Sequence, residues 1–134
     1  MSTQNNNSPK SILLIEDEAA LQEAIKMKLE KDGIKVTAFF TAEDAREFLK
    51  TERPDLVWLD ILLPGMNGLE FLKQIREDLN LKDLPVVVVS VSSSPEKIKK
   101  AFSLNIADFI VKSESDLKTI IARVEGHLSK ISKS

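Results

Sequence analysis

Short apolar runs recur along the chain and predict the buried strands of a sheet. They cover residues 12–15, 34–39, 55–60, 86–90 and 109–111. The fourth run begins with four consecutive valines. This lack of alternation is typical of a strand that is covered on both faces, as in a parallel sheet. Pro54 and Pro64 bound the third run, which delivers a carboxylate, Asp60, at its end.

Apolar residues at helical spacing fill the intervals between these runs. Gly33 stops the first of these helical patterns. Helix-start signals are Thr41 with Asp44, Asn67 with Glu70, and Ser94 with Pro95. The residues at helical spacing in successive helices are Leu21, Ala24, Ile25, Lys28 and Leu29; Ala45, Phe48 and Leu49; Leu69, Leu72, Ile75 and Leu79, which fit an inner face; Ile98, Ala101 and Phe102; and Leu117, Ile120, Ile121, Val124, Leu128 and Ile131.

The alternation of five strands with five helices predicts an α/β fold. Short connections of this kind imply a parallel sheet with helices on both faces, an open doubly wound three-layer sandwich. A closed barrel of eight such units needs roughly 250 residues, and this chain has 134. We expect a single domain at 10–131, a disordered tail at 1–9, a fraying end at 129–134 and no output domain.

Composition excludes several classes of protein. The net charge of -2 gives no reason to expect binding to nucleic acid or to a membrane. The chain has no cysteine, which rules out disulfides and thiolate metal sites and fits a reducing compartment. No apolar run approaches the roughly 20 residues that span a bilayer, and the polar start lacks a signal-peptide core. A cytoplasmic protein is the expectation.

Polar side chains stand at the ends of four of the five predicted strands. They are Glu16, Asp17, Asp60, Ser90 and Lys112. Ligands of open α/β sheets bind outside the carboxyl ends of the strands, where strand order reverses. If the strand order is 2-1-3-4-5, these side chains converge. The three carboxylates then repel one another, and one lysine does not balance them, so Mg²⁺ is the expected cofactor. A carboxylate can also attack phosphorus and form an acyl phosphate.

Each of these residues taken alone has an ordinary structural explanation. Asp17 could cap the first helix and Asp60 could form a turn. Ser90 could be a simple strand-end hydroxyl, and Lys112 a solvated cation. Phe109 taken alone is interpreted as a core residue. Their joint placement at the strand ends favours a functional site.

Two further features are interpreted as structural. His127, the only histidine, lies late in the last helix, where a cation suits the helix dipole. The basic run Lys97, Lys99 and Lys100 is interpreted as a solvated helix face, with a partner contact as the alternative.

Over residues 10–130, the chain resembles the receiver domain of two-component response regulators. The matching residues are the acidic pair Glu16-Asp17, the stretch from Leu59-Asp60 to Pro64-Gly-Met-Asn-Gly68, and Ser90, Phe109 and Lys112. The resemblance implies a flavodoxin-like fold with strand order 2-1-3-4-5. It also implies that Asp60 accepts a phosphoryl group from a histidine kinase or phosphotransfer protein, with Lys112 as the conserved-type lysine.

The resemblance further assigns the metal ligands and the switch. Mg²⁺ would bind Asp17, Asp60 and the backbone carbonyl of Leu62, with Glu16 acting through water. Phosphorylation would draw Ser90 inward and let Phe109 rotate toward the core. The surface of the fourth helix, fifth strand and fifth helix would then engage a downstream protein or a second copy of the chain.

Three departures from the family pattern stand out. Ser113 follows the lysine where the family usually has proline, so a cis peptide is not expected there. Asn105-Ile106 replaces a usual Gly-Ala before the last strand. Leu62 occupies a position where some relatives carry a polar side chain near the attacking water, which predicts a long-lived phosphorylated form.

Two other functions remain as alternatives. A degenerate receiver would act only as a protein-interaction module without phosphorylation. A hydrolase with an aspartyl nucleophile of the haloacid-dehalogenase type needs a second aspartate where Leu62 stands, and no glycine-rich phosphate loop is present. The expected protein is therefore a signalling domain and not an enzyme.

Overall fold

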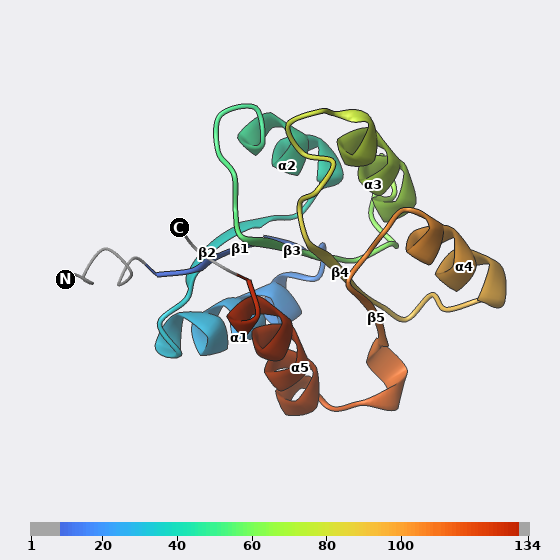
Figure 1. Ribbon diagram of the computed structural model, residues 1–134. Coiled ribbons are helices and arrows are strands. Elements are labelled where there is room, and N and C mark those ends of the chain that lie inside the picture. The colour runs from blue at the N-terminus through green and yellow to red at the C-terminus, as the bar shows by residue number, and fades with distance from the viewer. Residues whose placement is uncertain (1–8, 132–134) are drawn as a thin grey trace.

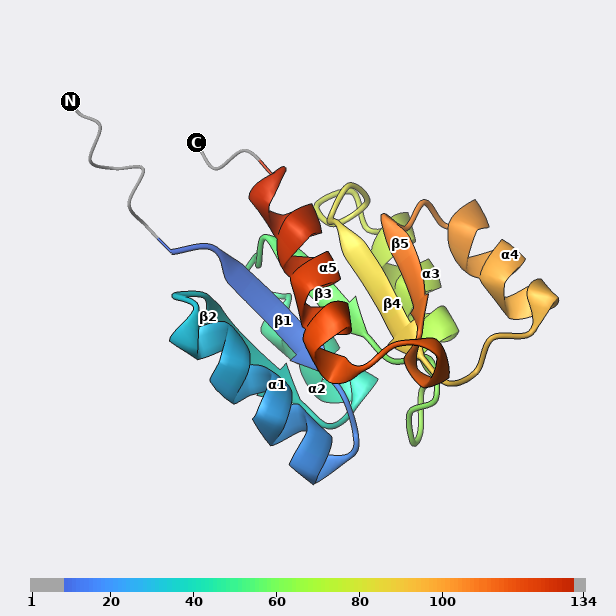
Figure 2. The same cartoon turned by 90° about the horizontal axis from the view of Figure 1, so that it is seen from below.

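The computed structural model describes residues 9–131, and they form a five-stranded parallel sheet between two helical layers (Figures 1 and 2). The strands are β1 (Ser11–Ile15), β2 (Lys35–Phe39), β3 (Leu56–Leu59), β4 (Val86–Ser90) and β5 (Asp108–Val111). The helices are α1 (Ala19–Lys31), α2 (Ala42–Phe48), α3 (Gly68–Glu77), α4 (Pro95–Ser103) and α5 (Leu117–Ser129), with a 3-10 turn at Lys112–Glu114.

Strand order is β2-β1-β3-β4-β5, which confirms the predicted topology. The order reverses between β1 and β3, which pair in parallel from Ile12 with Leu56 to Ile15 with Leu59. All five residues of β4 are buried, as the valine run predicted. A crevice at the carboxyl ends of β1 and β3 is the general consequence of such a reversal.

The sheet separates two hydrophobic cores. Helices α2, α3 and α4 cover one face, and α1 and α5 cover the other (Figure 1). Successive residues of one strand point to opposite faces, so Leu59 enters the first core while Trp58 enters the second. Trp58 is completely buried. Both faces of β3 are thus held by packing right up to Asp60.

The capping signals form as predicted. Thr41 accepts a hydrogen bond from the Asp44 backbone N–H at 3.1 Å. Asn67 and Glu70 form a reciprocal capping box, which fixes the start of α3. Because α3 begins at Gly68, this cap also anchors the loop that carries the chain away from Asp60.

Among the apolar residues predicted at helical spacing, Ala24, Leu79 and Phe102 are exposed. Leu79 is 83% exposed, so its assignment to the inner face of α3 is wrong. The helix ends at Glu77, and the Asp78 carboxylate then accepts the Asn80 N–H at 2.9 Å, which turns the chain. Phe102 is 49% exposed, because Ala101 occupies the buried position of α4.

The predicted terminal segments lie mostly outside the described residues. The tail at 1–9 falls there except for Pro9, and the end at 129–134 falls there from residue 132 onward. Within residues 9–131, no helix has the length and apolar character needed to cross a bilayer.

Candidate functional site

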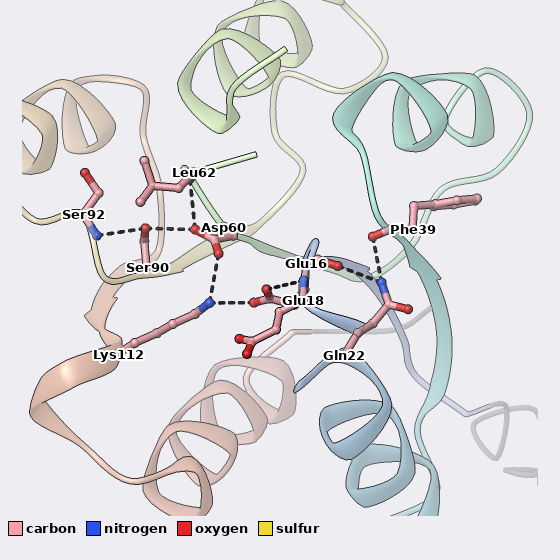
Figure 3. A network of polar contacts seen from close by, with 9 residues as sticks. All are labelled: Glu16, Glu18, Gln22, Phe39, Asp60, Leu62, Ser90, Ser92 and Lys112. Atoms are coloured by element: carbon pink, nitrogen blue, oxygen red, sulfur yellow. Dashed lines mark hydrogen bonds and ion pairs between the residues drawn. The ribbon is translucent and has the colours of Figure 1, made fainter. Parts of the chain in front are cut away.

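The carboxyl ends of four strands bring the predicted polar residues together (Figure 3). Glu16 follows β1, Asp60 follows β3, Ser90 closes β4 and Lys112 follows β5. The chain leaves the sheet at each point, so these side chains project from one edge. Asp17 lies beside them, next to Glu16.

Three carboxylates form the acidic part of the cluster. Oxygen atoms of Glu16, Asp17 and Asp60 all lie within 4.8 Å of one another. Glu16 and Asp60 are buried at 1% and 4% exposure, whereas Asp17 is exposed. An all-oxygen donor set that is open to water on one side fits a hard divalent ion such as Mg²⁺.

Lys112 bridges two of these carboxylates. Its Nζ donates to Glu16 Oε1 at 2.6 Å and to Asp60 Oδ2 at 2.9 Å. Burial opposes the ammonium form, but the hydrogen bonds and the charges of both carboxylates outweigh it and raise the pKa of Lys112. The lysine is therefore held as a cation beside Asp60, and its solvated-cation interpretation does not fit the geometry.

Glu16 is the buried member of the acidic pair. Burial of its carboxyl group raises its pKa, against the lowering effects of Lys112 and of the Glu18 N–H, which donates to Oε2 at 3.1 Å. The neighbouring Asp17 does not cap α1, because the N-cap residue is Glu18 and no side chain caps that helix. Asp17 is thus not used in the capping role that the sequence left open.

Asp60 is held by donors on both of its oxygens. Oδ1 accepts from the Leu62 N–H at 3.0 Å and from Ser90 Oγ at 2.9 Å, while Oδ2 accepts from Lys112. Ser90 Oγ in turn accepts the Ser92 N–H at 3.2 Å. These donors fix the orientation of the Asp60 carboxylate.

Comparison with known proteins places this arrangement in a family. Residues 12–125 match the response regulator receiver domain. The chain belongs to the receiver family. It is 32% identical to the response regulator Rcp1 of Synechocystis, over 90% of this chain and 88% of that protein.

Two solved structures show the same fold. The non-phosphorylated HemR receiver domain from Leptospira biflexa superposes with a TM-score of 0.84 at 31% identity, covering 93% of this chain and 98% of that chain. The Mn²⁺-bound form of Rcp1 gives a TM-score of 0.80 at 27% identity, covering 94% and 99%. The chain spans about half the length of some curated relatives, 54% and 53% in two of them.

Phe109 and Ser90 already face inward in this receiver. Phe109 is 8% exposed and packs in the core beneath α2, α3 and α4. Ser90 is completely buried and bonded to Asp60. The inward arrangement that the resemblance assigns to the phosphorylated form is therefore accessible to the unmodified chain.

The structure shows how the chain accommodates Ser113 and Asn105, two of the residues that depart from the family pattern. The Lys112–Ser113 peptide is trans, since no cis bond occurs in the described residues, and the 3-10 turn carries Lys112 to the site. Asn105 adopts a left-handed conformation with φ of 61°, which asparagine tolerates better than most residues. Arg76 donates to the carbonyls of Leu104 at 2.7 Å and Asn105 at 3.2 Å, so α3 holds the exit of α4.

Two supporting residues hold the site in place: Gln22, which carried no sequence signal of its role, and Gly68, which the resemblance named without assigning it a contact. Gln22 donates from Nε2 to the carbonyls of Glu16 at 3.0 Å and Phe39 at 2.9 Å, which ties the acidic pair to β2 (Figure 3). Gly68 packs against the backbone of Asp60, whose carbonyl oxygen would lie 2.4 Å from an added Cβ. His127, by contrast, lies away from the site and contacts Asp108 at 2.9 Å.

Proposed function

We propose that this receiver accepts a phosphoryl group on Asp60 with the help of Mg²⁺, and that a histidine kinase or phosphotransfer protein is the donor. The observation that carries the proposal is the set of contacts at Asp60. Its carboxylate is fixed by Ser90, Lys112 and the Leu62 N–H, with Glu16 and Asp17 beside it. That set provides a nucleophile, a cation and donors for new phosphoryl oxygens.

The transfer requires little chemistry from the protein. An Asp60 oxygen attacks the phosphorus of a phosphohistidine, the new O–P bond forms as the P–N bond breaks, and the histidine nitrogen keeps the electron pair and takes up a proton. Asp17, Asp60 and the Leu62 carbonyl would hold Mg²⁺, with Glu16 acting through water. When bound, the ion would neutralise charge on the transferring group. Lys112 and Ser90 would then contact the phosphoryl oxygens.

The output proposed for this switch is the surface of α4, β5 and α5. Ser90 and Phe109 lie on β4 and β5, so a phosphoryl group that holds Ser90 inward also favours the buried position of Phe109. Because both residues are inward already, phosphorylation would stabilise an existing arrangement and shift its population. A downstream protein or a second copy of the chain would read that surface.

The first test is intact mass after incubation with Mg²⁺ and acetyl phosphate or phosphoramidate. We expect a gain of one phosphoryl group that disappears in Asp60→Asn and in EDTA. Trp58 gives a second readout, because this only tryptophan lies two residues before Asp60. Its fluorescence should change on Mg²⁺ binding in the wild type and much less in Asp17→Asn.

The same experiment decides between the two receiver functions. Phosphorylation at Asp60 supports the switch. If the mass does not change with either small donor and Mg²⁺ leaves the Trp58 fluorescence unaltered, the site is inert. The alternative, a degenerate receiver that acts as an interaction module, then takes its place.

A further inference from the structure

A basic, apolar-floored groove lies between the start of α3 and α4, beside the loop that follows Asp60. It has a volume of about 480 Å³. Its lining is Ile61, Leu62, Leu63, Leu69, Asn67, Glu70, Lys73, Lys97 and Lys100. This volume lies within the range of roughly 300–1,000 Å³ that is usual for binding pockets. Helices α3 and α4 lie side by side in both views (Figures 1 and 2).

Positive charges outnumber negative charges in the groove, with three lysines and one glutamate in its lining. Lys73 comes from α3, and Lys97 and Lys100 stand three residues apart on one face of α4. None of the three forms an ion pair with a carboxylate in the described part of the chain. The one acid of the lining, Glu70, is engaged in capping α3, where its Oε1 accepts the Asn67 N–H at 3.3 Å.

The floor of the groove is apolar and partly open. Leu62 is 47% exposed, and Ile61 and Leu63 lie buried on either side of it. An occupant of matching chemistry therefore needs apolar side chains on one face and negative charges around them. An acidic amphipathic segment has both.

Two paths connect this groove to the phosphoacceptor. On one side, the Leu62 N–H donates to Asp60 Oδ1. On the other, Lys97 Nζ donates to Ser92 Oγ, the Ser92 N–H donates to Ser90 Oγ, and Ser90 Oγ donates to Asp60 Oδ1 (Figure 3 shows the last two bonds). A phosphoryl group on Asp60 would compete for the Ser90 hydroxyl and the Leu62 N–H. Its effect would reach the groove through the loop that carries Leu62 and through the contact of Ser92 with Lys97.

We propose that the α3–α4 groove is a docking site for an acidic amphipathic segment of a partner protein, and that phosphorylation of Asp60 changes its affinity. The docking itself stands on the groove's shape and charge, while the coupling rests on the proposed function. This surface differs from the α4–β5–α5 surface proposed above, because its walls are the loop after β3 and the facing sides of α3 and α4.

The binding test uses a fluorescein-labelled synthetic peptide with leucines at i, i+3, i+4 and i+7 and glutamates elsewhere, and a scrambled peptide of the same composition. Fluorescence anisotropy should show binding of the first peptide that weakens as salt is raised. Lys73→Glu with Lys100→Glu should weaken it about tenfold or more. Lys100→Glu alone should weaken binding severalfold. Its matched control is Lys99→Glu, which makes the same charge change on α4 outside the groove and should alter affinity by less than about twofold.

Three results would overturn the docking site. They are equal binding of the scrambled peptide, an equal loss with Lys99→Glu, and shifts of backbone amide resonances confined to α5 and β5 during a peptide titration. Flotation with phosphatidylglycerol vesicles that depends on Lys73 and Lys100, without peptide binding, would instead assign the groove to a membrane surface.

The coupling test compares protein with and without acetyl phosphate, with phosphorylation verified by mass. The peptide affinity should change severalfold on phosphorylation, and Lys97→Met should reduce that change while the mass gain persists. Peptide binding with no mass gain from acetyl phosphate or phosphoramidate, and with no Trp58 response to Mg²⁺, would retain the groove and reject the proposed phosphorylation. A mass gain with no change in peptide affinity would reject the coupling.

Discussion

Ser90 Oγ donates a 2.9 Å hydrogen bond to Asp60 Oδ1 in a completely buried position. Ser90 Oγ also accepts a hydrogen bond from the Ser92 N–H at 3.2 Å. The Ser90 hydroxyl therefore joins the phosphoacceptor to the start of the β4–α4 loop. Ser90 is thus both a structural link and the candidate switch. Its substitution should therefore affect stability before any phosphoryl group is present.

We expect Ser90→Ala to lower the free energy of unfolding by about 1–3 kcal/mol, because a buried carboxylate and a backbone N–H both lose a partner. Ser90→Thr keeps the hydroxyl and should recover most of that loss. Urea unfolding in EDTA measures the difference without metal. Equal stabilities of Ser90→Ala and wild type would show that the Ser90–Asp60 bond does not form in solution.

Gly68→Ala should destabilise the receiver by about 2 kcal/mol or more. A Cβ at this position would lie 2.4 Å from the Asp60 carbonyl oxygen and 2.7 Å from Ile61 Cα, and both are backbone atoms. The clash should displace Asp60 and slow its phosphorylation by acetyl phosphate. Thermal unfolding and the rate of mass gain report the two effects.

The matched control for this substitution is Gly126→Ala. Gly126 lies inside α5 with no atom within 4 Å of an added Cβ. Replacement of a helix-interior glycine by alanine should stabilise by roughly 0.5–1 kcal/mol. If both variants destabilise to a similar degree, the loss in Gly68→Ala does not come from contact with Asp60.

Asp108 should stabilise the fold in a pH-dependent way. Burial acts to raise the pKa of this carboxyl, but hydrogen bonds from His127 and Arg123 outweigh it and hold the pKa below the ordinary value of 3.8. The folded state therefore favours the carboxylate more than the unfolded state does. The stabilisation is complete above pH 3.8 and is lost as pH falls through the lowered folded value.

We expect Asp108→Asn to cost about 1 kcal/mol in the free energy of unfolding at pH 6. The difference in the free energy of unfolding between Asp108→Asn and wild type should shrink as pH drops below about 3.8. Urea unfolding of both proteins across that range measures it. A gap that stays constant down to pH 2.5, or that widens there, would contradict the assigned pairing with Arg123 and His127.

The phosphorylated form should decay slowly because Leu62 supplies no polar group to orient water at Asp60. Leu62 is 47% exposed, so a polar replacement should fold. We expect Leu62→Asn to shorten the half-life of the phosphorylated protein severalfold, measured by mass after removal of the donor. A wild-type half-life of seconds that Leu62→Asn does not shorten would refute the role of this position.

The sequence determined the strand and helix order because burial patterns are local. Four consecutive valines predict a doubly covered strand whatever surrounds it, and β4 is buried throughout. Asn67 with Glu70 predicts a helix start for the same reason, since the capping box needs only neighbouring residues. The convergence of Asp60 and Lys112 also needed the strand order 2-1-3-4-5, which the resemblance to receivers implied and the structure confirms.

Tertiary structure alone decided the contacts between residues that no spacing relates. The end of α3 before Leu79 is a local exception, because the Asp78 carboxylate accepts the N–H of Asn80 two residues further on. Gln22 gives no signal of its bonds to the carbonyls of Glu16 and Phe39, because these depend on how α1 packs against β1 and β2. The pairing of Lys97 with Ser92 likewise depends on how the β4–α4 loop folds back. Periodicity and capping act within a few residues along the chain, whereas the Gln22 contacts require the packed positions of separate elements.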